Sequence, residues 1–87
     1  MVWTATGHGA TYSINIDDDK NVQHYSSKDL PFTHSEVLTA HPGDLFQIVV
    51  SGKGDATVGC EITYNGQVVA SQPVNTADAQ CIWNVPN

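Results

Sequence analysis

Positive charge is scarce in this chain of 87 residues. Three lysines and no arginine stand against nine Asp and Glu residues, which gives a formal net charge of −6. A nucleic-acid binder needs clustered cations that displace counterions from phosphate, and a protein held to anionic lipid by charge needs basic residues at its surface. The composition argues against both functions, and we predict no nucleic-acid partner.

Long apolar runs are lacking as well. No window approaches the ~18 consecutive apolar residues of a membrane span. The stretch from Met1 to Gly7 has neither the basic nor the apolar region of a signal peptide. Apolar residues nevertheless make up 40% of the chain and are spread along it, which is not the composition of a disordered protein. One soluble domain with a small core, spanning residues 1–87, is predicted.

Cysteine is limited to Cys60 and Cys81, which both fall at inward positions of alternating runs. A disulfide between them would stabilise the domain by about 3 kcal/mol in the chain-entropy model. The alternative is two free cysteines that pack as small hydrophobic residues. A disulfide would indicate an oxidising compartment. We therefore expect Met1 to begin an ectodomain whose export or anchoring segment precedes it.

Apolar and polar residues alternate with a period of two along most of the chain. Tyr12, Ile14 and Ile16 fall on one face of such a run, and Cys60, Ile62 and Tyr64 on one face of another. No segment shows a helical pattern of useful length. Seven or eight short strands separated by turn signals indicate an all-β fold, a small antiparallel β-sandwich. The strands are expected at residues 2–6, 11–16, 22–26, 33–39, 45–51, 57–64, 67–72 and 79–85.

Two glycine-containing patterns predict tight turns, and one proline predicts the end of a strand. Asn65-Gly66 accepts positive φ at both positions, as a type I′ hairpin requires. His41-Pro42-Gly43-Asp44 has the pattern of a type II turn. Pro73 cannot donate to a ladder and is expected to end its strand. The expected hairpin pairs are Tyr64 with Gln67, Ile62 with Val69, and Cys60 with Ser71.

Metal-binding and catalytic patterns are incomplete. Asp17, Asp19 and Asn21 match the start of a calcium loop, but Val22 stands where that loop needs Gly and Lys28 where it needs Glu. We interpret the segment as a solvated turn. There is also no nucleophile elbow or phosphate-binding loop. We predict no enzyme, metal or cofactor. The four histidines are His8, His24, His34 and His41. Their spacing in the sequence makes no local metal site.

Leu30-Pro31-Phe32 is the candidate for a contact surface. Proline fixes an extended conformation, and both of its neighbours are large and apolar. One interpretation is a loop that plugs an end of the sandwich. The other is an apolar contact for a partner or ligand.

Several segments in order resemble one family. They are Val2–Gly7, Tyr12–Ile16, Leu30–Phe32, Ser51–Asp55, Gly59–Thr63, Asn65–Val68 and Ala79–Cys81. Their order resembles the extracytoplasmic domain of the mycobacterial membrane protein small (MmpS) family, and the most specific part is the series G-C-x-I-T, x-G-x-V and the second cysteine.

The resemblance implies an immunoglobulin-like β-sandwich with one disulfide. It implies an accessory role to MmpL-type transporters of the RND superfamily, which export lipids, glycolipids or siderophores. It also implies a location in the periplasm or cell envelope and an N-terminal membrane helix upstream of this sequence. A secreted β-sandwich that binds a ligand or a protein is the alternative expectation.

Overall fold

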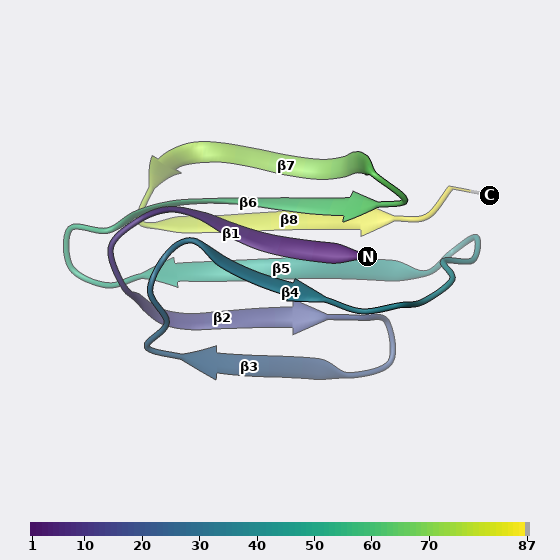
Figure 1. Cartoon of the computed structure of the whole chain (residues 1–87), viewed down its shortest axis with the longest axis horizontal. Coiled ribbons are helices and arrows are strands. Elements are labelled where there is room, and N and C mark those ends of the chain that lie inside the picture. The colour runs from purple at the N-terminus through teal and green to yellow at the C-terminus, as the bar shows by residue number, and fades with distance from the viewer. Residues whose placement is uncertain (87) are drawn as a thin grey trace.

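Eight strands make up the fold in the computed structural model of the chain, which describes residues 1–86 apart from the side chains of residues 75 and 76 (Figure 1). The part described contains no helix, and hence none long and apolar enough to cross a membrane. The strands are β1 (Val2–His8), β2 (Thr11–Asp17), β3 (Val22–Ser26), β4 (Phe32–Ser35), β5 (Leu45–Gly52), β6 (Thr57–Tyr64), β7 (Gln67–Thr76) and β8 (Asp78–Asn84).

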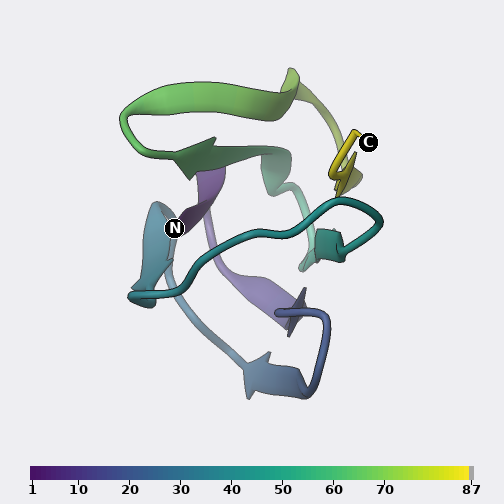
Figure 2. The same ribbon diagram turned by 90° about the vertical axis from the view of Figure 1, so that its right-hand side faces the viewer.

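Two four-stranded antiparallel sheets pack as a sandwich, so the predicted fold class is confirmed (Figure 2). One sheet has the order β4-β1-β6-β7 and the other β3-β2-β5-β8. Hairpins join β2 to β3 and β6 to β7, whereas the other five connections cross between the sheets. Two packed antiparallel sheets are the architecture of immunoglobulin-like sandwiches, but the order of the strands within each sheet differs from the immunoglobulin order.

The core follows from the period-two pattern except at the start of β2, where an irregularity between Thr11 and Ser13 leaves Tyr12 exposed and buries Thr11. Alternate residues of the central strands point between the sheets and are almost completely buried, and Trp3 and Phe46 are the largest of them. Their rings lie with centroids 6.4 Å apart. The buried apolar residues are Trp3, Ala5, Ile14, Ile16, Phe46, Ile48, Val50, Ala56, Val58, Cys60, Ile62, Ala79 and Cys81.

The disulfide between Cys60 and Cys81 is present, and it confirms the first of the two alternatives for these residues. Their Cα atoms are 6.0 Å apart, and both side chains are buried. Cys60 lies on β6 and Cys81 on β8, so the bond joins one sheet to the other. It closes a loop that contains the end of β6, its turn and all of β7.

The two turns predicted from glycine positions are confirmed. Asn65 and Gly66 have φ of 52° and 79°, as a type I′ turn needs. Gly43 has φ of 89°, and Asp44 N donates to His41 O at 3.0 Å, as in a type II turn.

The predicted register of the hairpin is right only next to its turn. Tyr64 pairs with Gln67 as expected, and Thr63 with Val68. A bulge at Val69 then shifts the ladder by one residue. The remaining predicted pairs are therefore wrong: Ile62 pairs with Ala70 and Cys60 with Gln72.

Two strand ends differ from the prediction by four residues, and the others by at most two. β7 continues through Pro73 to Thr76, because β7 is an edge strand and Pro73 lies in an irregular part of its ladder, where a missing N–H leaves no partner unpaired. β4 ends at Ser35 instead of residue 39. Ser35 lies opposite Val2, and the next pair, Met1 and Glu36, is joined by backbone hydrogen bonds but lies outside both strands.

Candidate functional site

A cleft of about 450 Å³ opens at one end of the sandwich, the end that faces the viewer in Figure 2. One wall is the turn between β2 and β3, and the other is the segment between β4 and β5 that crosses this end. Four of the nine acidic residues of the chain line the cleft, against one lysine. The lining residues are Asp18, Asp19, Lys20, Glu36, Val37, Leu38, Thr39, His41, Asp44 and Phe46.

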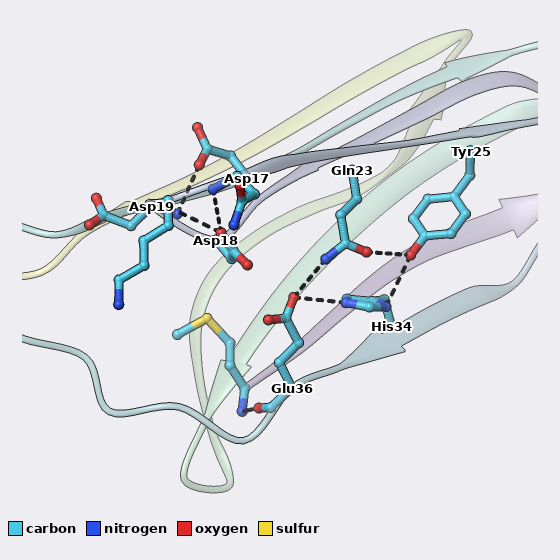
Figure 3. Close-up of polar contacts among 10 residues, drawn as sticks. Asp17, Asp18, Asp19, Gln23, Tyr25, His34 and Glu36 are labelled. Atoms are coloured by element: carbon cyan, nitrogen blue, oxygen red, sulfur yellow. Dashed lines mark hydrogen bonds and ion pairs between the residues drawn. The ribbon is translucent and has the colours of Figure 1, made fainter.

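The first wall is built by aspartates that bond to their own turn (Figure 3). Asp17 Oδ1 accepts from Asp19 N at 2.8 Å, and Asp18 Oδ1 accepts from Lys20 N at 3.1 Å and from Asn21 N at 2.7 Å. Asp19 has a positive φ of 77°, a conformation that Asp tolerates better than most residues. The D-x-D-x-N pattern thus specifies a hydrogen-bonded turn.

The hydrogen bonds within its own turn lower the pKa of Asp18. Burial acts to raise the pKa of Asp18. The backbone N–H groups of Asn21 and Lys20, together with a side-chain contact to Glu36, outweigh that effect and hold the pKa below its usual value of 3.8. Asp18, on the first wall, and Glu36, on the second, both line the cleft.

The second wall is an extended segment held at its two ends. At one end, Glu36 exchanges two backbone hydrogen bonds with Met1, at 2.9 and 2.7 Å. At the other end, Ala40 N donates to the Tyr64 hydroxyl at 3.0 Å, and His41 N donates to Asp44 Oδ2 at 2.9 Å. Between these anchors, the backbone of residues 37–39 makes no hydrogen bond within the described part of the chain.

A closed set of polar contacts lies beside the cleft and links β3 to β4 across the sandwich (Figure 3). Gln23 Nε2 donates to Glu36 Oε2 at 3.1 Å, and His34 Nε2 lies 2.8 Å from the same oxygen. Tyr25 OH donates to Gln23 Oε1 at 2.7 Å and lies 3.2 Å from His34 Nδ1. We call these four residues the polar ring. It fixes the Glu36 side chain at the mouth of the cleft.

The predicted contact residues lie elsewhere. Phe32 begins β4, whereas Glu36 follows the end of that strand, so Leu30-Pro31-Phe32 and the cleft are at opposite ends of it. Leu30 and Phe32 pack against the core, and the Phe32 ring lies 4.8 Å from that of Tyr25. Pro31 is exposed. Any contact made by this tripeptide is therefore made chiefly through Pro31.

The histidines are dispersed. His8, His24 and His41 are exposed, and His34 is half-buried in the polar ring. His24 Nδ1 lies 2.7 Å from Asn15 Oδ1 on the outer face of its sheet. Among residues 1–86, no group of three or more His, Cys, Asp or Glu side chains is arranged to hold a metal ion.

Sequence reasoning missed the cleft as a unit. It identified the Asp17–Asn21 turn and the His41–Asp44 turn separately, but nothing in the spacing of the residues shows that they meet at one end of the fold. Comparison of the chain with protein-family models, with curated proteins and with solved structures gives no match. The description of the cleft therefore depends on the residues of this chain alone.

Proposed function

We propose that this domain is a non-enzymatic accessory component of an MmpL-type exporter of the RND superfamily, which moves lipids, glycolipids or siderophores through the cell envelope. The domain acts by contact with the transporter. The proposal starts from the resemblance of the segments around Cys60 and Cys81 to the MmpS family.

The observation that carries the proposal is the disulfide between the sheets. It joins the two cysteines that belong to the most specific part of the resemblance. A disulfide is also consistent with an oxidising, extracytoplasmic location. A small core reinforced in this way gives a rigid body that can present its loops to a membrane partner.

Pro31 is the position at which to test contact with a transporter. The experiment places a photo-crosslinking amino acid at Pro31 in the native host and identifies adducts by mass spectrometry. The matched control carries the same amino acid at Asp55, which is exposed in the loop between β5 and β6. We expect an adduct with an RND-type transporter from Pro31 and not from Asp55. Equal labelling at both sites, or adducts without any transporter, would contradict the proposal.

The cleft favours a second candidate, a secreted sandwich that binds a ligand or protein on its own. Its volume of about 450 Å³ lies in the range of ligand sites, ~300–1,000 Å³. The codons upstream of Val2 distinguish the two functions. An uncleaved apolar stretch of about 20 residues supports the accessory role, whereas a cleavable signal peptide supports the secreted binder.

A further inference from the structure

The polar ring makes four contacts in a closed cycle, and each contact needs one donated hydrogen (Figure 3). An ionised Glu36 donates none, and the Tyr25 hydroxyl donates one. Gln23 faces one neighbour with its amide nitrogen and the other with its amide oxygen, so it also donates one within the cycle. Two hydrogens remain to be supplied, and His34 is the residue left to supply them.

The direction of each hydrogen bond follows from this count. Gln23 Nε2 donates to Glu36, and Gln23 Oε1 accepts from the Tyr25 hydroxyl. The Tyr25 oxygen can then only accept from His34 Nδ1, which lies 3.2 Å away. His34 Nε2 donates to Glu36 Oε2 at 2.8 Å. Both imidazole nitrogens donate, which is the pattern of a positively charged histidine.

A neutral His34 cannot preserve all four contacts. It carries one hydrogen, so Tyr25 would have to donate to His34 Nδ1 and stop donating to Gln23. The Gln23 amide would then turn over, and its oxygen would face Glu36 Oε2 at the 3.1 Å now spanned by a hydrogen bond. One contact is lost in either orientation of the amide. The His34 side chain is 20% exposed, so water has little access to a contact that opens.

The charged groups around His34 are mostly acidic. Glu36 is in direct contact with it, and the Met1 amino group donates to the backbone oxygen of Glu36 and not to its carboxylate. On β3 the facing titratable group is Tyr25, and on β1 the uncharged Trp3 lies with its ring centroid 5.6 Å from that of His34. The adjoining cleft holds the other charged or titratable side chains on this side, which are Asp18, Asp19, Lys20, His41 and Asp44.

From these contacts we propose that the polar ring is a pH-dependent latch between the two sheets. The latch is complete when His34 carries a hydrogen on both nitrogens, and it has one contact fewer when His34 is neutral. Histidine is the side chain that changes charge near neutral pH. The latch holds β3, in one sheet, to β4, in the other, and its state changes how firmly Glu36 is fixed at the mouth of the cleft.

The sign of the effect follows from the number of contacts. The latch stabilises the fold most at acid pH, where His34 is charged and Glu36 is still ionised, and part of this contribution is lost as the pH rises. The inference depends neither on a ligand nor on a transporter. A missing adduct at Pro31 would therefore leave it unaffected, and the two proposals fail independently.

The first test counts the hydrogens on the His34 imidazole by nitrogen-15 NMR of the labelled chain, from pH 5 to pH 8.5. We expect hydrogens on both nitrogens at the acid end and on Nε2 alone at the alkaline end, because the Glu36 carboxylate still needs a donor. The exposed His8 serves as the reference histidine. A single hydrogen on His34 at pH 5 would overturn the proposal. Two hydrogens at pH 8.5 would also overturn it, because the latch would then stay closed.

The second test measures the contribution of the latch by urea unfolding at pH 5.5 and pH 8.5. The Tyr25 hydroxyl makes two hydrogen bonds when His34 is charged and one when it is neutral. We therefore expect Tyr25→Phe to raise the unfolding constant about fivefold more at pH 5.5 than at pH 8.5, the effect of one hydrogen bond. His34→Gln should show the same trend. His8→Gln is the matched control and should have the same effect at both pH values.

Tyr25→Phe separates the latch from a simple ion pair. The pair of His34 and Glu36 would by itself make His34→Gln more costly in acid, but it would not make Tyr25→Phe depend on pH. Equal effects of Tyr25→Phe at the two pH values would therefore overturn the proposal. The NMR titration uses the unaltered chain, so it decides the matter even if a variant does not fold.

Discussion

The two long sides of the sandwich are closed by different chemistry. On the side of β7 and β8, a buried disulfide joins the sheets. On the side of β3 and β4, the polar ring of Gln23, Tyr25, His34 and Glu36 joins them. A covalent bond restricts the unfolded chain as well as the folded one, whereas hydrogen bonds exchange with water and contribute less. The cleft adjoins the polar side, so Glu36 serves both the ring and the cleft.

The largest effect is expected from reduction of the disulfide. Loss of the Cys60–Cys81 bond should lower the free energy of unfolding by about 3 kcal/mol. For a domain of this size that lowers Tm by roughly 12–24 °C. Calorimetry with and without reductant measures the change. An unchanged Tm would show that the disulfide adds nothing to the free energy of unfolding, and it would contradict this prediction.

A smaller effect is expected from removal of one hydroxyl in the polar ring. Tyr25→Phe deletes the group that contacts both Gln23 and His34. We expect a loss of about 1 kcal/mol, measured by urea unfolding. Tyr12→Phe is the matched control, because the Tyr12 side chain is exposed and its hydroxyl has no hydrogen-bond partner among the described residues. Equal losses in the two variants would mean that the Tyr25 hydroxyl adds nothing to stability through the polar ring.

Combining the two changes tests whether the sides are independent. The polar ring and the disulfide lie at opposite edges of the sandwich, so their effects should add within about 0.5 kcal/mol. The measurement is urea unfolding of Tyr25→Phe in its oxidised and reduced forms. A larger coupling would indicate that closing one side positions the other.

The smallest effect concerns Asp18. Its pKa is lowered in the folded state, so its contribution to stability is complete above the usual value of 3.8 and is lost as the pH falls through the folded value. Asp18→Asn should destabilise the chain by less than about 1 kcal/mol at pH 7, because solvent screens this carboxylate. The difference in Tm between Asp18→Asn and the parent, measured from pH 7 to pH 2, should become smaller in acid. A difference that does not change with pH would contradict the lowered pKa of Asp18. Asp55→Asn is the control.

Local patterns in the sequence were sufficient for the strands and the tight turns. Alternation places Ile14, Ile16 and Ile62 in the core, and Asn65-Gly66 fixes the hairpin turn because only residues that accept positive φ fit there. The cysteines could be paired because both lie on inward faces. These inferences need only neighbouring residues.

The remaining features depend on contacts between distant segments. The passage of β7 through Pro73 is possible because β7 is an edge strand, and the bulge at Val69 shifts the register of its ladder. No local pattern reveals either feature. β4 ends at Ser35 although the alternation of exposure continues to Ala40, so the pattern alone does not mark the end of the strand. The cleft was not predicted because Asp18 and Glu36 come to line it only after two sheets have formed.

Pro73 has a consequence for solubility. β7 is ten residues long, has no charged residue, and has one edge that pairs with no other strand. Uncharged edges of this length recruit further chains and begin fibrils. A proline offers no N–H to an incoming chain, and the irregular ladder beside it bends the strand away from a straight template. The residue that interrupts the sequence pattern of β7 therefore helps to keep the folded domain from polymerising through this edge.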